Sequence, residues 1–352
     1  MLSLESNSPM SLNSRIKSTF WKIDDSDRGV IHSRSIKPFE HGQLNYDDPR
    51  VIEALKHHNN KWFHTEIAVK VENGLIEPQY GYAVGGLRSL NGVSIRTRNN
   101  LPSPLPTLKA KLFGRCKKME KAVLIDGSMG INYFHFLSDV LHKIYLLEQF
   151  TDLDCPLLVG RTVWSKPFFQ FFIRETALSQ FDWQPVDDPI LAKTLFIARP
   201  MPYEEKYWQK TKKLLIDQDA PLKDKKAIFV NRTGTRRIVN FKSISEVLTD
   251  HGVEIVDPGM WSVKEQAHLF NSASHIIGIH GAGMTNVAFC DHHKTKVLEL
   301  CSNNRIGTQY YWLCTALGIN WDMMLGSDAH QDQSFELDAK AFSERLDKFL
   351  TD

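Results

Sequence analysis

Hydrophobic and polar positions along the chain change from an irregular pattern to a regular alternation at about residue 122. Short apolar runs, typical of buried strands, alternate with longer stretches whose apolar residues recur at helical spacing. The apolar runs lie at 122–126, 157–160 and 194–198, and the amphipathic stretches lie at 132–150, 167–178 and 203–216. Strands that alternate with helices in this way predict a parallel α/β sheet.

The same rhythm resumes after a polar segment at 217–226, where we place the linker between two domains. Strands are expected at 228–231, 253–257, 276–279, 296–301 and 321–325, and further helices at 309–317 and 335–350. Ser243 with Glu246, and Ser262 with Glu265, have the spacing of a capping box. This spacing predicts that two more helices begin at the serines.

The first 120 residues are less regular. Residues 1–20 are rich in serine and asparagine, which predicts a loose tail. Alternating runs around Asn73-Gly74 predict a β-hairpin, and the proline-rich segment 101–106 predicts a loop. We therefore divide the chain into an N-terminal domain with the tail and hairpin, a second domain and a C-terminal helix that is free to pack back on the first domain. These parts span residues 1–218, 219–330 and 331–352.

Composition limits the number of domains and the classes of partner further. The chain has 352 residues, of which 42% are hydrophobic, so it is long enough for two domains with cores of their own. The formal net charge is +2 at pH 7, which gives no support for a nucleic-acid partner. The five cysteines are odd in number and form no Cys-x-x-Cys pair, which is typical of free thiols in a reducing compartment.

The same composition bears on location. No apolar stretch has the length of a membrane span or the character of a signal peptide, so we expect a cytoplasmic protein. Small basic clusters lie at 206–213 and 223–226. Solvated helix faces explain most such clusters, and peripheral contact with the inner membrane is the alternative, because anionic lipid attracts basic segments. The oligomeric state stays open.

A glycine-bearing turn follows one of the expected strands. The run 276–279 leads into His-Gly-Ala-Gly-Met-Thr-Asn over 280–286, with a helix start expected at about Thr285. Glycines let a ligand approach the backbone, and the unpaired amides at a helix N-terminus bind anions. The turn is therefore a candidate phosphate site, although a strand-to-helix turn without a ligand has the same local pattern.

Charged residues follow or end two other strands. Arg232, Arg236 and Arg237 come after the strand at 228–231, and guanidinium groups bind phosphate oxygens bidentately. Glu299 lies near the end of the strand at 296–301, where a carboxylate can accept the hydroxyls of a ribose. A solvated basic loop explains the arginines as well, and a salt-bridged or helix-capping role explains Glu299.

Polar residues also share one face of the helix expected at 132–150. Asn132, His135, Asp139 and His142 recur three or four positions apart beside an apolar stripe. A His or an Asp with a tuned pKa can act as a general base. Asp139 can instead orient His135, and an ordinary solvent-exposed face would give the same pattern.

In this order and spacing, these segments together resemble glycosyltransferase family 61, of the bacterial capsular polysaccharide biosynthesis type. The resemblance covers about residues 120–325 and rests on 130–139, 231–240, 261–266 and 280–286 with Glu299. It implies a GT-B-like α/β fold, in which two Rossmann-like domains face each other across a cleft. In such a fold, residues 1–218 would form the acceptor-side domain and residues 219–330 the nucleotide-sugar-binding domain. It also implies inverting, metal-independent transfer from a nucleotide sugar, for which we expect a UDP-sugar. The acceptor would be a saccharide or glycolipid in bacterial surface polysaccharide or lipopolysaccharide synthesis.

The resemblance assigns roles to the candidate residues. His135 and Asp139 are the catalytic candidates, with the choice of base open, and Asn132 and His142 are on the acceptor side. The donor-binding candidates are Arg232, Arg236, Arg237, His280, Gly281, Ala282, Gly283, Asn286 and Glu299. Arg237 is the weakest of the arginines, since neighbours on a turn point in different directions. For Asn286 we favour a role in holding the turn closed.

We expect no metal and no other cofactor. The histidine pairs at 57–58 and 292–293 are adjacent in sequence and lack the spacing of metal ligands. Two other classes of protein stay open at this point. A nucleotide-sugar epimerase can share the two-domain shape, and a non-catalytic nucleotide-binding scaffold can retain the fold.

Overall fold

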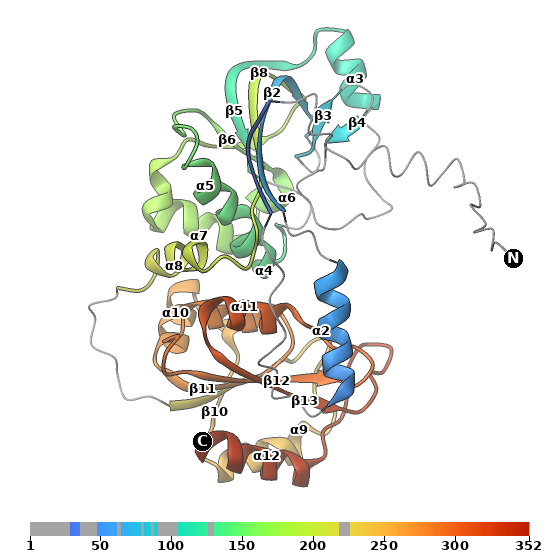
Figure 1. Ribbon diagram of the computed structural model, residues 1–352, viewed down its shortest axis with the longest axis vertical. Helices are drawn as coiled ribbons and strands as arrows, with labels where there is room; N and C mark the ends of the chain where they lie inside the picture. Colours follow the sequence, from blue (N-terminus) through green and yellow to red (C-terminus); the bar gives the residue numbers. More distant parts are fainter. Residues whose placement is uncertain are drawn as a thin grey trace, which may run out of the picture.

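The computed structural model describes residues 29–35, 48–61, 65–78, 81–85, 88–90, 105–125, 130–217 and 226–351. Two sheets organise these residues into a mixed α/β fold, as the alternation of strands and helices predicted. The sheets lie one above the other in Figure 1, the eight-stranded one formed by the first half of the chain and the five-stranded one by the second. The linker expected at 217–226 lies almost entirely outside the described residues.

The first sheet is mixed and has the order β4-β3-β2-β8-β5-β6-β7, with β1 also paired to β2. Its strands are β1 (Val30–Ser35), β2 (Thr65–Ile76), β3 (Ala83–Gly85), β4 (Arg88–Leu90), β5 (Lys117–Leu124), β6 (Leu157–Gly160), β7 (Trp183–Val186) and β8 (Ile190–Arg199). β8, β5, β6 and β7 are parallel, whereas the pairs among β1 to β4, and β2 with β8, are antiparallel. Three of the parallel strands coincide with predicted apolar runs, and β7 is an addition.

The first half of the chain also contains helices. They are α2 (Pro49–Lys61), α3 (Leu105–Leu112), α4 (Tyr133–His135), η1 (Phe136–Leu141), α5 (His142–Leu147), α6 (Arg161–Trp164), α7 (Pro167–Glu175), η2 (Ala177–Gln180) and α8 (Glu205–Lys213). α4, η1 and α5 follow one another without a break, and η1 is a π-helical turn. α2 lies beside the second sheet in Figure 1, where Arg50 donates a hydrogen bond to Asn303.

The predicted hairpin exists, but its turn lies later than Asn73-Gly74. β2 runs through both residues, and Gly74 is needed for packing, because a Cβ there would lie 2.6 Å from the Leu195 side chain. The chain reverses between β2 and β3, where the Glu77 amide donates to the Tyr82 carbonyl at 2.9 Å. The loop expected at 101–106 is also partly wrong, since Leu105 and its following proline begin α3, a position at which proline suits a helix.

The second sheet is wholly parallel. Its strands are β9 (Lys226–Val230), β10 (Glu254–Val256), β11 (Ala273–Ile279), β12 (Lys296–Ser302) and β13 (Asn320–Gly326), in the order β10-β9-β11-β12-β13. The strand order therefore reverses between β9 and β11. In doubly wound sheets of this order, ligands bind outside the carboxyl ends of the two strands at that reversal.

Helices cover both faces of this sheet. They are α9 (Phe241–Asp250), η3 (Pro258–Met260), α10 (Val263–Asn271), η4 (Ala282–Phe289), α11 (Gln309–Leu317) and α12 (Ala339–Thr351). The capping box at Ser262 is confirmed, whereas α9 begins at Phe241 after Asn240, so Ser243 lies within the helix. In Figure 1, α10 and α11 lie between the second sheet and the first half of the chain.

The C-terminal helix does not pack back on the first domain. Phe342, Leu346 and Phe349 of α12 share a hydrophobic cluster with Ile244 and Leu248 of α9. The apolar stripe of α12 is thereby buried against α9, on the face of the second sheet that is turned away from the first half of the chain (Figure 1). The expectation for residues 331–352 is therefore corrected.

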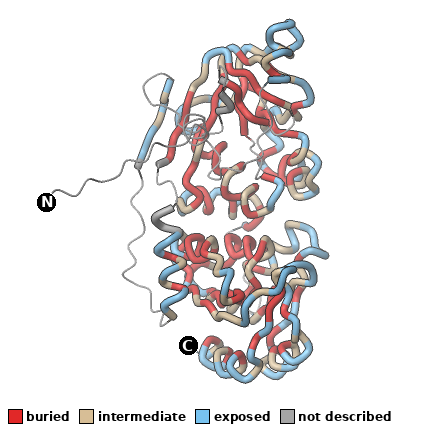
Figure 2. The backbone as a smooth tube through the Cα atoms, turned by 90° about the vertical axis from the view of Figure 1, so that its right-hand side faces the viewer, coloured by how far each residue is buried: buried red, intermediate tan, exposed pale blue. Residues whose placement is uncertain are grey.

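A single hydrophobic cluster joins the two halves of the chain. It includes Phe134 and Trp208 from the first half and Tyr310 and Trp312 from the second. Figure 2 shows buried backbone on both sides of the junction. In the part of the chain that the structure describes, no helix combines the length and the apolar character that a bilayer crossing requires.

Candidate active site

Two arginines converge at the point where the strand order of the second sheet reverses. Nη1 of Arg232 and Nη1 of Arg236 lie 3.3 and 3.5 Å from the carbonyl oxygen of His280, the residue that follows β11. Among the described residues, no carboxylate lies within ion-pair distance of either guanidinium. Burial, together with the charge of Arg236, lowers the pKa of Arg232. Two cations held together without an acidic partner favour an anionic ligand.

The glycine turn is shaped around these arginines. A Cβ on Gly281 would lie 1.5 Å from Nη1 of Arg232, so only glycine leaves room for the guanidinium. Tyr310 is buried, and its hydroxyl donates to the Gly281 carbonyl at 2.5 Å. The helix expected from about Thr285 begins earlier, as the 3-10 helix η4 that contains Ala282 and Gly283.

Asn286 holds the turn together, as expected. Its Nδ2 donates to the carbonyl of Gly283 at 3.2 Å and to Oε1 of Gln266 at 2.8 Å. Its Oδ1 accepts from the hydroxyl of Tyr133 at 3.1 Å, which ties the turn to α4 in the other half of the chain. The side chain is fully buried, so it acts on the turn and does not face a ligand.

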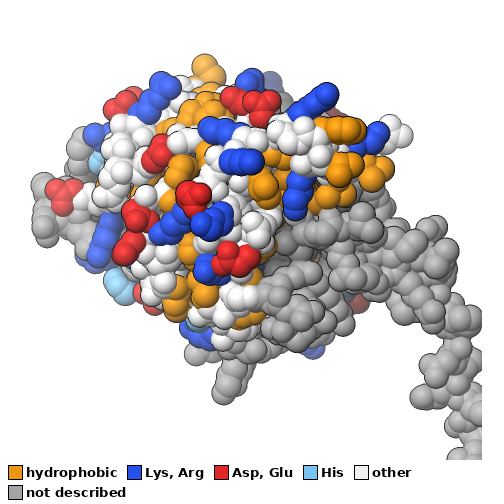
Figure 3. Space-filling view, turned by 90° about the horizontal axis from the view of Figure 1, so that it is seen from above, with side chains coloured by type: hydrophobic (Ala, Val, Ile, Leu, Met, Phe, Trp, Pro, Cys, Tyr) orange, Lys and Arg blue, Asp and Glu red, His pale blue; other side chains and the backbone are white. Residues whose placement is uncertain are grey.

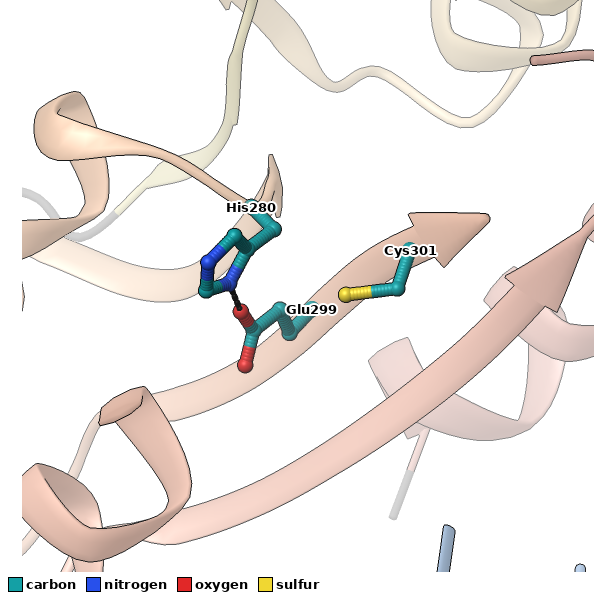
Figure 4. A group of neighbouring side chains, drawn as sticks. All are labelled: His280, Glu299 and Cys301. Carbon is teal, nitrogen blue, oxygen red and sulfur yellow. Dashed lines mark hydrogen bonds and ion pairs between the residues drawn. The ribbon is translucent and has the colours of Figure 1, made fainter. Parts of the chain in front are cut away.

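Glu299 does not face the site in the way that ribose binding requires. Its side chain is 0% exposed, and both oxygens have partners within the fold. Oε1 is hydrogen-bonded to Nδ1 of His280 at 2.5 Å, and Oε2 accepts from Nε1 of Trp321 at 2.9 Å. Figure 4 shows the imidazole meeting this carboxylate. Glu299 therefore positions His280, whose Nε2 has no hydrogen-bond partner among the residues that the structure places.

Cys301 completes a group of three potential metal donors. Its thiol, Nδ1 of His280 and a carboxylate oxygen of Glu299 lie within 4.8 Å of one another (Figure 4). Burial raises the pKa of the Cys301 thiol well above its usual value, which opposes the thiolate that metals bind. The carboxylate is already shared between two donors. The three residues therefore fit a histidine held in place by a buried carboxylate better than a complete metal site.

A pocket of about 370 Å³ opens beside His280 at the carboxyl ends of β11 and β12. Its lining comes from the ends of β11 and β12 and from segments that follow the strands, and it includes Arg236, Ser302, Arg305, Gln309 and Gln333. Gly307 also lines it, and a Cβ at that position would lie 2.0 Å from the His280 ring. No sequence motif marks residues 302–309 or Gln333, and only the fold brings them to His280.

The neighbouring arginines 236 and 237 point in different directions, as expected for adjacent residues on a turn. Arg236 adopts a left-handed backbone conformation with φ 65°, and its Nε donates to Oε1 of Gln333 at 3.1 Å in the pocket. Arg237 pairs instead with Asp332 at 2.7 Å on the surface. The structure therefore brings Arg232, Arg236 and His280 together and leaves Arg237 outside.

On the helical segment that begins at Tyr133, His135 and Asp139 form a pair. Nδ1 of His135 lies 2.8 Å from Oδ2 of Asp139, and Ser138 donates to the other carboxylate oxygen at 3.3 Å. Burial would raise the pKa of Asp139, but the charge and hydrogen bond of His135 outweigh it and lower that pKa. Asp139 is thus ionised at neutral pH. Asn132 caps the helix by accepting from the Phe134 amide at 2.9 Å, which is a structural role.

His142 is not at the site. Its side chain is 0% exposed, and neither ring nitrogen has a hydrogen-bond partner among the described residues. The ring packs edge-on against Trp208, with ring centroids 4.7 Å apart, and beside Tyr207, with centroids 5.3 Å apart. The π-helical turn η1 changes the helical repeat between His135 and His142, so regular α-helical spacing placed it on the wrong face. Burial lowers the pKa of His142 to about 3.

This burial predicts a pH-dependent stability. His142 stays neutral in the folded chain, whereas in the unfolded chain its pKa is about 6.5. Below that pH the unfolded state takes up the proton, so the unfolding free energy falls as pH drops from about 6.5 towards 3. His142→Phe should remove this contribution, worth about 2 kcal/mol at pH 5. Denaturant unfolding of both proteins at pH 7 and pH 5 measures it, and an equal pH dependence in both would contradict the burial.

Aromatic rings connect the two groups of residues. Phe134 packs edge-on against Tyr310 with ring centroids 5.7 Å apart, and Tyr310 packs edge-on against His280 at 5.4 Å. Phe134 also neighbours His135 in sequence, and their rings are in contact at 5.4 Å. The His135–Asp139 pair and the arginine-rich turn thus lie at one junction between the halves.

Comparison with known protein families gives an informative match. The family model described as Glycosyltransferase 61 matches residues 133–298, which include the His135–Asp139 pair and the arginine-rich turn. No curated protein sequence matches the chain. Among solved structures, the chain is similar to the metal-soaked Flv1 flavodiiron core from Synechocystis sp. PCC6803, with 12% identity, a TM-score of 0.24 and 51% of each chain covered. A likeness this weak carries no argument.

Proposed function

The chain belongs to glycosyltransferase family 61 and is a glycosyltransferase, and from that premise we propose that it transfers a sugar from a nucleotide sugar, without a bound metal, to a saccharide acceptor. The observation that carries the proposal is the convergence of Arg232 and Arg236 on the His280 turn without a carboxylate partner. We further propose a GT-B-like pairing of two Rossmann-like units, a UDP-sugar as donor and a role in bacterial surface polysaccharide or lipopolysaccharide synthesis.

The leaving group explains the need for the arginines. A nucleoside diphosphate gains negative charge as the bond between its oxygen and the anomeric carbon breaks. Fixed cations and backbone amides that face this oxygen stabilise the charge in the transition state. Arg232, Arg236 and the amides of the turn after His280 supply such groups at the carboxyl edge of the sheet, where the topology favours a ligand.

His280 adds a further donor in the proposed site. Glu299, which accepts a hydrogen bond from Trp321, holds Nδ1 of its imidazole and leaves Nε2 for a phosphate or sugar oxygen of the donor. The pocket beside it, with Ser302, Arg305 and Gln309 in its lining, is large enough for part of a nucleotide sugar.

The His135–Asp139 pair is the proposed base. As the acceptor hydroxyl attacks the anomeric carbon from the face opposite the diphosphate, Nε2 of His135 takes its proton, and the configuration inverts. The ionised Asp139 holds Nδ1 and stabilises the imidazolium that forms. In this arrangement Asp139 orients the base and is not itself the base.

Nucleotide binding tests the proposal most directly. We expect UDP to raise the melting temperature of the protein equally in Mg²⁺ and in EDTA, because the proposed charge clamp is made of arginines. At about 100 times the dissociation constant, the stabilisation is about 2.7 kcal/mol. A thermal-shift panel of UDP, GDP, CMP and ADP measures the effect. Arg232→Ala should abolish the shift, and Arg237→Ala, a matched arginine on the same turn, should keep it.

Three results would contradict the proposal. A shift that requires Mg²⁺ would indicate that a metal takes part in nucleotide binding, and the potential metal donors His280 and Glu299 would then be its candidate ligands. If none of the four nucleotides raised the melting temperature, the proposed donor site would be ruled out. Conversion of a nucleotide sugar in the absence of any acceptor would indicate an epimerase.

A further inference from the structure

An exposed apolar surface lies at α3 and the residues that follow it. The side chains of Leu112 and Phe113 are 80% and 67% exposed, and Leu105 at the start of the helix is 58% exposed. Large apolar side chains this exposed and this close in sequence are uncommon on a protein surface without a binding role. We call residues 105–118 the α3 tip.

The α3 tip is also basic. Lys109, Lys111, Arg115, Lys117 and Lys118 lie within it, and residues 105–119 contain no Asp or Glu. In the part of the chain with described positions, none of these five cations forms an ion pair. The Arg115 guanidinium lies 5.7 Å from the centre of the Phe113 ring, which places positive charge directly beside the exposed apolar surface.

The basic cluster at 206–213 is different, because three of its four lysines are used within the fold. Lys210 pairs with Glu148 at 2.9 Å, Lys212 donates to the Cys290 carbonyl at 2.6 Å, and Lys206 lies 4.9 Å from the centre of the Tyr207 ring. This cluster and the one at 223–226, most of which lies outside the described residues, were the sequence-based candidates for membrane contact. The structure leaves the α3 tip as the better one.

We propose that the α3 tip docks on an anionic lipid bilayer. Leu112 and Phe113 would enter the boundary between headgroups and acyl chains, and the flanking lysines and Arg115 would contact lipid phosphates. Figure 1 shows α3 at the end of the molecule farthest from the second sheet. Seen onto that end, hydrophobic and basic side chains lie next to each other at the right of Figure 3. The surface is separate from the proposed site, so the inference stands independently of the transfer chemistry.

Co-sedimentation with vesicles tests the docking. We expect the full chain to bind vesicles of phosphatidylcholine with phosphatidylglycerol and to bind phosphatidylcholine alone much more weakly. Leu112→Glu with Phe113→Glu should weaken binding at least about tenfold, because both apolar insertion and charge attraction are lost. Lys109→Gln with Lys111→Gln should weaken it by about tenfold, and added salt should do the same to the unmodified chain. Met260→Glu, at an 83% exposed apolar residue on η3, is the matched control and should bind normally.

Two further readouts separate docking from other causes. The variants should keep the melting temperature and the UDP response of the unmodified protein, so a lost fold or a lost donor site would be recognised. Failure of the unmodified chain to bind anionic vesicles would overturn the proposal, as would normal vesicle binding by Leu112→Glu/Phe113→Glu. A change of oligomeric state in that variant, measured by analytical ultracentrifugation, would assign the surface to contact between copies of the chain and would also overturn it.

Discussion

Arg232→Ala is expected to lower kcat/KM for sugar transfer about 100- to 1,000-fold while the protein remains folded. Removal of one preorganised donor to a developing anion typically has an effect of this size. Arg232 is also half of a pair of like charges, so its loss relieves repulsion in the absence of ligand and should not lower the melting temperature. Initial rates with a UDP-sugar donor, combined with thermal unfolding, measure both effects.

Gly281→Ala provides an independent version of the same experiment. The added methyl group would occupy the position of Nη1 of Arg232, so the guanidinium must move although the arginine is still present. We expect a loss of activity similar to that of Arg232→Ala. Arg237→Ala, which removes only a surface ion pair, should have nearly normal activity. Normal turnover by Arg232→Ala would rule out the assigned phosphate clamp.

His135→Ala is expected to lower kcat about 100- to 10,000-fold with little change in donor binding. This range is typical for the loss of a general base. The side chain is partly exposed at the junction of the halves, so its removal should leave the core unaffected. Single-turnover rates with saturating donor and acceptor measure the chemical step.

Asp139→Asn distinguishes the base from the residue that orients it. If His135 is the base, Asp139→Asn removes only the carboxylate that orients its ring, so part of the activity should survive. If Asp139 is the base, Asp139→Asn should be as inactive as His135→Ala or more so. Single-turnover rates of the two variants under the same conditions distinguish these outcomes.

The donor side of the candidate site was largely predictable from sequence. The strand before His280, the glycine turn and the arginines after β9 are contiguous motifs, so their local structure depends on neighbours in the chain. Ser262 and Glu265 carry a complete local capping signal and begin a helix as predicted. The acceptor pair His135 and Asp139 followed from helical spacing over a single turn.

The predictions from sequence were wrong where contacts with distant residues, or an irregular helical turn, determine the position of a side chain. His142 lies beyond a π-helical turn, which no side-chain pattern announces, and spacing across it is misleading. Glu299 carries the charge expected of a ribose ligand, but Trp321 from the next strand buries it against His280. Asn73-Gly74 has the composition of a hairpin turn, yet Gly74 is required there by the Leu195 side chain of a neighbouring strand.

The hydrophobic cluster that joins the halves has a consequence for engineering. In an enzyme with two domains, a common way to change donor or acceptor specificity is to exchange one whole domain between relatives. Here Phe134 packs on Tyr310, and the Tyr133 hydroxyl donates to Asn286 within the glycine turn itself. A first half taken from a relative would therefore bring its own side chains into the core that shapes this turn. If the proposed roles hold, point changes around His135 are a better way to alter acceptor choice than exchange of whole halves.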